Sequence, residues 1–108
     1  MSSFFLDRTG GEEPEEDDWV LTLFIAGRSP NSQRALQNLR EIIAQHLPGR
    51  CSVQVVDILD DPLAAIARDI LVAPTLVRLS PLPEVKITGS LSDRQKVLVA
   101  LGLVEAER

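Results

Sequence analysis

The sequence predicts one small α/β domain in which helices cover both faces of a mixed β-sheet. Three observations lead to this fold class. The chain has 108 residues, which suits a single core; valine- and leucine-rich runs alternate with segments of helical spacing; and proline or glycine separates these segments. We expect the domain to span residues 19–104, with residues 105–108 as a short C-terminal tail.

The first strand and the first helix are predicted from residues 19–47. Residues 19–26 are a nearly continuous apolar run, as expected for a central strand that is covered on both faces. Gly27 interrupts the run, Ser29 offers an N-cap oxygen, and Pro30 suits the first position of a helix. The helix should end at a proline–glycine pair, and its apolar residues recur at helical spacing: Ala35, Leu36, Leu39, Ile42, Ile43 and Leu47.

A second strand and a second helix follow. Valine-rich residues 52–58 predict the strand, and Asp61 is the expected N-cap of the helix. Pro74 takes the chain out of helical geometry, because the residue before a proline avoids the α region. The apolar positions of this helix are Leu63, Ile66, Ala67, Ile70 and Leu71.

Residues 75–79 and 84–88 predict two more strands, which pair antiparallel because only a short turn joins them. Ser92 and Gln95 form a capping box for a last helix. The element order is β-α-β-α-β-β-α, and the first β-α-β unit should be parallel and right-handed. This order is that of the thioredoxin-like architecture, a four-stranded mixed sheet with helices on both faces.

The net charge of −5 is concentrated at the N-terminus. Residues 1–18 carry seven acidic residues and one arginine, whereas residues 19–108 carry nine acidic and ten basic residues. A like-charged segment cannot offset its ordering entropy by burial, so we expect residues 1–18 to be a disordered or loosely attached tail. The near-neutral body has no strong basic excess, which argues against nucleic-acid binding.

The sequence also predicts a cytoplasmic protein. No apolar run approaches the ~20 residues needed to cross a bilayer, and the first residues lack the basic start of a signal peptide. Cys51 is the single cysteine, so no internal disulfide can form.

Redox chemistry of the thioredoxin kind is close to excluded. Its reactive cysteines would stand at the turn before the first helix, where this chain has Ser29 and Ser32. An N-cap is the favoured interpretation of Ser29. The segment around Pro74 faces the same turn in such folds, usually with a cis peptide bond. A serine at the turn before the first helix could also activate a glutathione thiol, which leaves a glutathione transferase as an alternative. This alternative is weak, because 108 residues leave no room for the second helical domain of that class.

Other reactive groups do not form a predicted site, and we expect no enzyme activity, metal or cofactor. His46 is the only histidine, so a Ser-His-Asp triad or a histidine-based metal site cannot be assembled with assurance. We interpret Cys51 as a small apolar residue at the start of a strand. The acidic cluster of Asp57, Asp60 and Asp61 is better explained by capping and solvation than by metal binding.

Three motifs in order carry a resemblance to a known family. Residues 19–36 contain an aromatic-led strand followed by Ala-Gly-Arg-Ser-Pro-Asn-Ser-Gln-Arg-Ala. Residues 56–62 (Val-Asp-Ile-Leu, then Pro62) and 70–76 (Ile-Leu-Val-Ala-Pro-Thr-Leu) form the second motif, and residues 89–98 (Gly-Ser-Leu-Ser-Asp-Arg-Gln-Lys-Val-Leu) the third. At this spacing they resemble the KaiB family of bacterial circadian clock proteins, over about residues 19–104.

The resemblance implies a non-enzymatic adaptor. KaiB-like proteins bind the ATPase ring of KaiC and oppose KaiA, and they compete with a related domain of a clock histidine kinase. Arg34, Arg78, Lys86 and Arg94 match basic positions of the family, some of which face a partner. Asp69 stands where the family has a lysine that contacts the partner, so the charge there is reversed. A second function class stays open, a stress-related or glutathione-binding thioredoxin-fold protein with no clock partner.

The resemblance also implies a second possible fold. KaiB-like proteins can switch to a ground state of order β-α-β-β-α-α-β that self-associates as a dimer or tetramer. The switch region begins near Pro74, and residues 96–104 fit a helix or a strand almost equally well. Ala100 stands where the family often has glycine, and alanine stabilises a helix by ~1 kcal/mol relative to glycine. Gly102 lowers this stabilisation by a few tenths of that amount. The sequence therefore predicts a small bias toward the thioredoxin-like form.

Overall fold

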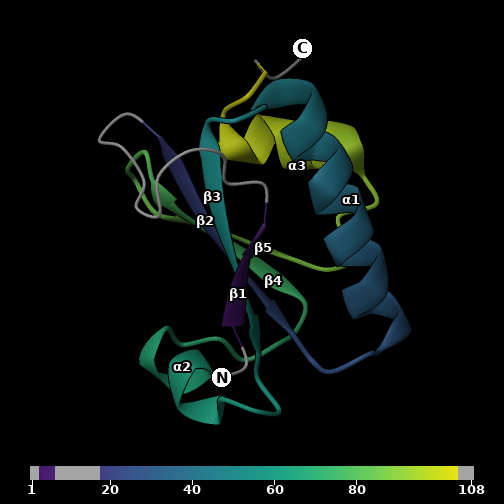
Figure 1. The fold of residues 1–108 in the computed structure, drawn as a ribbon, viewed down its shortest axis with the longest axis vertical. Helices are drawn as coiled ribbons and strands as arrows, with labels where there is room; N and C mark the ends of the chain where they lie inside the picture. Colours follow the sequence, from purple (N-terminus) through teal and green to yellow (C-terminus); the bar gives the residue numbers. More distant parts are fainter. Residues whose placement is uncertain (1–2, 7–17, 105–108) are drawn as a thin grey trace.

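A computed structural model of the chain describes residues 3–6 and 18–104 (Figure 1). The described elements are strands and helices of one α/β chain. In order they are β1 (Ser3–Leu6), β2 (Trp19–Ile25), α1 (Pro30–His46), β3 (Cys51–Asp57), α2 (Pro62–Ala67), β4 (Thr75–Ser80), β5 (Val85–Thr88) and α3 (Arg94–Leu101).

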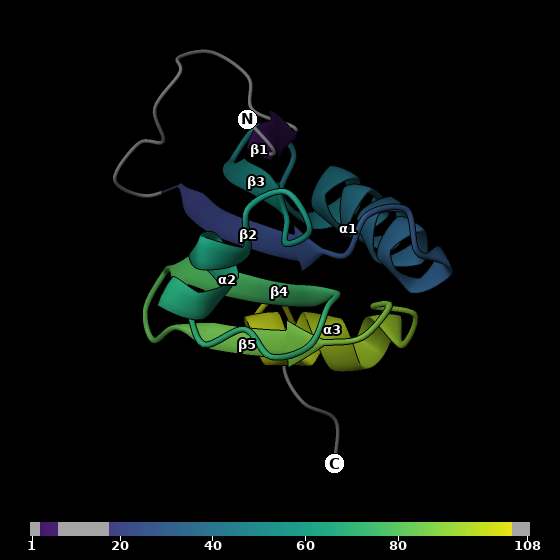
Figure 2. The ribbon, with the colours of Figure 1, turned by 90° about the horizontal axis from the view of Figure 1, so that it is seen from below.

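The strands form one mixed sheet in the order β1-β3-β2-β4-β5. β2 and β3 are parallel, as predicted for the first β-α-β unit, and β4 pairs antiparallel with both β2 and β5. α1 and α3 lie on one face of the sheet and α2 lies on the other (Figure 2). The predicted thioredoxin-like α/β fold, with its four-stranded mixed sheet and helices on both faces, is confirmed.

β1 is an additional strand at the edge of this sheet. It pairs antiparallel with β3 in a register that runs from Ser3↔Val56 to Leu6↔Val53. At Ser3–Leu6 the structure therefore differs from the prediction of a disordered tail over residues 1–18. Three consecutive apolar residues precede the acidic run, and β3 offers an edge with which they can pair. The rest of the predicted tail, residues 1–2 and 7–17, and the predicted C-terminal tail lie outside the described residues.

The larger apolar core lies between the sheet and the helices α1 and α3. α1 contributes the buried face of its amphipathic pattern, as the spacing of its apolar residues predicted. The strands contribute alternate residues, and α3 closes the core from the side of β5. The largest fully buried side chains of this core are Leu21, Leu23, Leu39, Ile42, Ile43, Leu76 and Leu101.

The opposite face of the sheet carries a smaller core under α2. Its buried members are Phe24, Val56, Ala65, Ile70 and Val77. α2 ends at Ala67, earlier than the predicted apolar positions extend, because Asp69 adopts a left-handed φ of 55°. This helix of six residues covers the face only in part.

The helix ends confirm two predicted caps and correct a third. Ser29 caps α1 and Asp61 caps α2, each through a side-chain oxygen that accepts a backbone N–H. The cap of α3 is Asp93 and not Ser92, since the Asp93 carboxylate accepts the N–H of Lys96 at 3.2 Å. Ser92 instead accepts a hydrogen bond from the Ser90 hydroxyl at 3.0 Å, within the loop that precedes the helix.

Candidate partner-binding surface

The turn between β2 and α1, where a thioredoxin carries its cysteines, is held by hydrogen bonds among its own residues. The Ser29 hydroxyl donates to the Ser32 hydroxyl at 2.7 Å, and the Ser32 oxygen also accepts the N–H of Ala26 at 3.0 Å. Ser32 is 1% exposed. Both hydroxyls therefore take part in the hydrogen bonds of the turn, and that of Ser32 belongs to a buried residue.

Asp57 fixes the same turn from β3. One oxygen of its carboxylate accepts the N–H groups of Gly27 and Leu59, both at 3.0 Å. This role accounts for one member of the acidic cluster noted in the sequence. No group of three His, Cys, Asp or Glu side chains in the described part of the chain could hold a metal ion.

The histidine and the cysteine differ in their exposure. His46 is exposed at the C-terminal end of α1, whereas the thiol of Cys51 is fully buried at the start of β3. Within residues 3–6 and 18–104, no helix is long and apolar enough to cross a membrane.

The most distinctive surface lies on and beside α2. Five of the six large apolar side chains that are exposed among the described residues come from this short part of the chain: Leu59, Leu63, Ile66, Leu71 and Val72. Leu71 alone is 94% exposed. We call these five residues the α2 surface. Monomeric proteins rarely leave such clusters of apolar side chains in water unless they bind something.

The sequence analysis gave three residues of the α2 surface as apolar positions of the second helix. The structure shows that Leu63, Ile66 and Leu71 are exposed. Ile70, which was among the predicted positions, and Ala65, which was not, belong to the smaller core. A signal was present in the sequence, because α2 is apolar around its whole circumference. A helix of this kind has more apolar positions than one buried face can accommodate.

Two of the predicted partner-binding residues border the α2 surface. Asp69 and Lys86 line a shallow cavity of about 150 Å³, together with Leu71 and Val72. The Lys86 ammonium donates to the backbone carbonyl of Arg68 at 2.7 Å, which fixes it beside the turn that follows α2. The α2 surface is thus an apolar patch with an acidic and a basic side chain at its rim.

Two other predicted residues lie along the seam between α1 and α3. Arg94 on α3 forms a salt bridge with Glu41 at 2.8 Å and donates to Gln45 at 2.8 Å. Arg34 lies on the same stripe of α1, because residues 34, 38, 41 and 45 share one helical face. Hydrogen bonds from Gln37 and Arg94 lower the pKa of Glu41 below its usual value. Arg94 therefore has an internal partner, while Arg34 is exposed.

Arg78, the fifth predicted residue, lies inside the molecule. It is 7% exposed, and its guanidinium donates to the carbonyl oxygens of Leu101 and Pro83, the latter at 2.7 Å. The ring of Trp19 lies 5.6 Å from its guanidinium carbon. The sequence analysis placed Arg78 among the partner contacts, but in this fold it cannot present its charge to a partner.

The three residues of the predicted switch region occupy different environments. Pro74 is buried and follows a cis peptide bond, in agreement with the expectation for this segment. Ala100 is exposed on α3. Gly102 ends α3 in the left-handed conformation, with φ 83°. Gly102 therefore does not lower the stability of α3 as expected for a glycine inside a helix, because glycine is the favoured residue at such a helix end.

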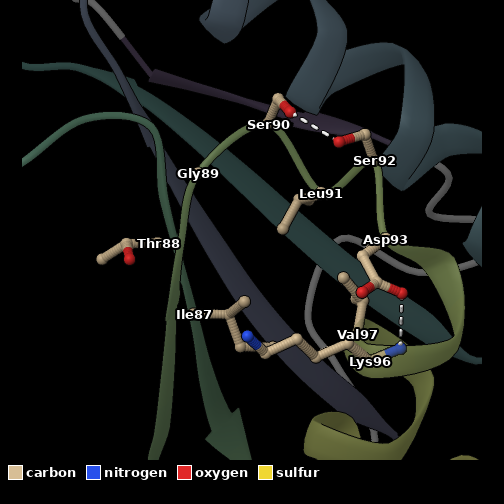
Figure 3. A pocket seen from close by; sticks show the side chains of 9 residues that line it. All are labelled: Ile87, Thr88, Gly89, Ser90, Leu91, Ser92, Asp93, Lys96 and Val97. Atoms are coloured by element: carbon tan, nitrogen blue, oxygen red, sulfur yellow. Dashed lines mark hydrogen bonds between the residues drawn. The ribbon is translucent and has the colours of Figure 1, made fainter.

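A second pocket lies between the end of β5 and the start of α3 (Figure 3). It has a volume of about 310 Å³ and is lined by residues of the third sequence motif, among them Asp93 and Lys96, together with Ile87 and Thr88 of β5. Ser90 and Ser92 bond to each other, and Asp93 caps α3 (Figure 3). The side chains of Ser90, Ser92 and Asp93 thus hold the loop and the start of α3.

Comparison with known proteins identifies the family. The KaiB domain family matches residues 22–103 of this chain. The circadian clock oscillator protein KaiB of Trichodesmium erythraeum is 45% identical over 94 residues, which are 87% of this chain and 90% of that protein. The chain belongs to the KaiB family. The KaiB of a Cyanothece strain is 44% identical over the same lengths. The family resemblance inferred from the three motifs is confirmed, and with it the assignment to circadian clock proteins.

Solved structures support the fold independently. The N-terminal domain of SasA from Synechococcus elongatus superposes with a TM-score of 0.66 at 24% identity, over 93% of this chain and 98% of that domain. Chloroplastic thioredoxin z superposes with a TM-score of 0.66 at 19% identity, over 82% of this chain and 80% of that one. This KaiB family member therefore adopts the thioredoxin-like fold that it shares with both.

Proposed function

We propose that this KaiB family member is a non-enzymatic cytoplasmic adaptor that binds a KaiC-type ATPase and modulates its phosphorylation or ATPase state. The observation that carries the proposal is the α2 surface. It holds five exposed apolar side chains. Two of them, Leu71 and Val72, line a cavity together with Asp69 and Lys86, two positions that the family resemblance associates with partner contact.

The chemistry of the α2 surface suits a protein partner. Apolar side chains supply the free energy of association, at about 1.5–3 kcal/mol for each large side chain that is fully buried. The charged residues at the rim supply selectivity. The cavity of about 150 Å³ is too small for most cofactors but could receive one side chain of a partner.

The reversed charge at Asp69 determines which partner fits. A carboxylate at the rim favours a basic side chain opposite it and repels an acidic one. We propose that the ATPase of the same host carries a basic residue at this contact. KaiA and a clock histidine kinase would be affected indirectly, through competition for the ATPase.

We further propose that Arg34 makes a second contact with the ATPase, from the exposed face of α1. Arg94 supports this contact by holding Glu41 and Gln45 on the neighbouring turns. Arg78 has no part in the proposed interface, since it is buried.

The test is a pull-down of the host's own KaiC homologue with paired variants. Leu63→Lys removes one apolar contact of the α2 surface and should weaken binding at least about tenfold, because 1.4 kcal/mol corresponds to a factor of ten. Leu82→Lys is the matched control, since Leu82 is also exposed, at 79%, but lies in the turn between β4 and β5. Equal binding by both variants and the native chain would contradict the proposed surface.

The non-enzymatic part of the proposal has its own test. Because the Ser29 and Ser32 hydroxyls brace a turn and Cys51 is buried, we expect no reduction of insulin disulfides above background. Reduction that persists in a Cys51→Ala variant would contradict this, as would retention of the protein on glutathione-agarose.

A further inference from the structure

Asp69 carries an exposed charge that no neighbouring group neutralises. Among the described residues, its carboxylate takes part in no hydrogen bond and no ion pair. Two cations stand close to it: Arg68 precedes it in the chain, and Lys86 lines the same cavity of about 150 Å³. Each of these cations is held by another group.

Glu84, which directly precedes β5, holds the charge of Arg68. The guanidinium donates to both oxygens of the Glu84 carboxylate, each at 3.3 Å. The two side chains are 44% and 40% exposed, so their ion pair contributes little to the stability of the fold. The ammonium of Lys86 donates to the backbone carbonyl of Arg68 at 2.7 Å. These contacts engage both cations and leave the carboxylate of Asp69 available to a partner.

The end of α2 does not require an aspartate at this position. The N–H of Ile70 donates to the carbonyl of Ala65 at 2.9 Å, and the N–H of Asp69 donates to that of Ile66 at 3.1 Å. This pair of hydrogen bonds is the Schellman motif, in which Asp69 occupies the left-handed position with φ 55°. Glycine is the usual residue there, because a Cβ is strained at such a φ. The carboxylate of Asp69 is thus present where folding alone favours glycine, which points to a role in binding.

The cavity beside Asp69 suits a long basic side chain. Its apolar walls include Ile70, Leu71 and Val72, and Asp69 lies at its rim. Arginine and lysine bury an apolar stem along such walls and keep the charged head at the rim. Of the two, the planar guanidinium of arginine can donate two parallel hydrogen bonds to one carboxylate.

We propose that Asp69 is the specificity-determining residue of the α2 surface and that it binds an arginine side chain of the ATPase. This inference rests on the proposed function, because it names the group of the ATPase that the cavity receives. The arginine stem lies against Leu71 and Val72, and its guanidinium pairs with the Asp69 carboxylate. Glu84 is a positioning residue, since it holds Arg68 and so keeps Asp69 unpaired until the partner binds.

The test is the affinity of the full chain and its variants for the host's own KaiC homologue, measured by titration calorimetry. Asp69→Asn removes the charge and keeps a residue type that tolerates a left-handed φ, so it should weaken binding about tenfold or more. Asp60→Asn is the matched control, because Asp60 is an exposed aspartate that does not line the cavity, and it should bind as the native chain does. Asp69→Gly should weaken binding as Asp69→Asn does and should raise the midpoint of urea unfolding. A residue with a merely structural role would not separate affinity from stability in this way.

The positioning role of Glu84 is tested in the same titration. Glu84→Gln releases Arg68, whose charge can then offset that of Asp69, so this variant should also bind more weakly. Adding Arg68→Gln to it should restore the affinity, because the competing cation is then gone. Both residues are partly exposed, so the fold should tolerate each change.

The outcomes separate this proposal from the proposed function. Native affinity in Asp69→Asn, an equal loss in Asp60→Asn, or no restoration by the second substitution would overturn the role of Asp69 and Glu84. If Leu63→Lys still weakens binding in that case, the α2 surface remains the contact with the ATPase. A native chain that does not bind the ATPase at all would overturn both.

Discussion

The guanidinium of Arg78, on β4, donates a hydrogen bond to the backbone carbonyl of Leu101, the last residue of α3. A second hydrogen bond reaches the carbonyl of Pro83, and the Trp19 ring lies against the cation. No carboxylate pairs with Arg78 among the described residues. The cation is stabilised instead by carbonyl oxygens, one of which lies at the C-terminus of α3, the negative end of the helix dipole. Arg78 thus ties the end of α3 to β4 and to the turn before β5.

We expect Arg78→Met to destabilise the thioredoxin-like fold by about 1–3 kcal/mol, because it leaves two carbonyl groups without their donor. Urea unfolding followed by Trp19 fluorescence measures the change. Arg34→Met is the matched control, and this exposed residue should change the stability by no more than about 0.5 kcal/mol. A midpoint for Arg78→Met at or above that of the native chain would show that the buried cation contributes nothing.

Gly102 should resist substitution because of its conformation and its neighbour. Its φ of 83° strains any residue with a Cβ, and a Cβ here would lie 3.3 Å from Nη1 of Arg78. We expect Gly102→Ala to cost about 1 kcal/mol or more in the thioredoxin-like form. Ala100→Gly should cost about 1 kcal/mol through helix propensity alone, since Ala100 is exposed.

Both substitutions should raise the population of any alternative fold that does not contain α3. Backbone chemical shifts across residues 97–104, together with the sedimentation coefficient, report this change. Helical chemical shifts and an unchanged molecular mass in both variants would contradict the predicted small bias toward the thioredoxin-like form. A strand signature in a stable tetramer of the native chain would show that the bias lies in the opposite direction.

Arg34→Glu should weaken association with the ATPase and leave the fold intact, since an exposed helix charge contributes little to stability. Titration calorimetry at low and high salt measures the effect, which should be larger at low salt because screening reduces the contribution of exposed charges. Arg40→Glu serves as the control, because Arg40 is an exposed arginine of α1 that does not lie on the stripe of residues 34, 38, 41 and 45. The same loss of affinity in both variants would indicate a general charge effect and no specific contact.

Glu41 predicts a pH dependence of the seam between α1 and α3. The hydrogen bonds from Gln37 and Arg94 lower its pKa from 4.5, so the folded protein binds this proton less readily than the unfolded chain does. The contribution of Glu41 to stability is therefore present above pH 4.5 and is lost as the pH falls through the lower, folded pKa. Unfolding midpoints of the native chain and of Glu41→Gln should differ at neutral pH and converge in acid. A constant difference between the two midpoints over the whole pH range would contradict the assigned contribution of Glu41 to stability.

Local chemistry made several features predictable from the sequence. Ser29 and Pro30 fix the start of α1, because a cap and a preset φ act within one turn of the chain. Pro62 after Asp61 does the same for α2. The KaiB motifs identify the family because each keeps residue types at fixed spacing. Asp69 and Lys86, named from the family resemblance, lie together at the rim of the α2 surface.

The features that the sequence could not show depend on which groups meet in space. The apolar pattern of α2 has no preferred face, so only the packing of Ala65 against the sheet decides that Leu63 and Ile66 remain exposed. Arg78 has the sequence context of an exposed strand residue, and only the approach of the α3 C-terminus gives its charge a buried set of acceptors. The pairing of β1 with β3 joins residues about fifty positions apart, and no local signal specifies such a partner. Residue type and spacing determined the secondary structure and the family of this chain, because those depend on short-range conformational preferences. The tertiary structure alone decided which surfaces are free to bind, because exposure depends on what the rest of the chain covers.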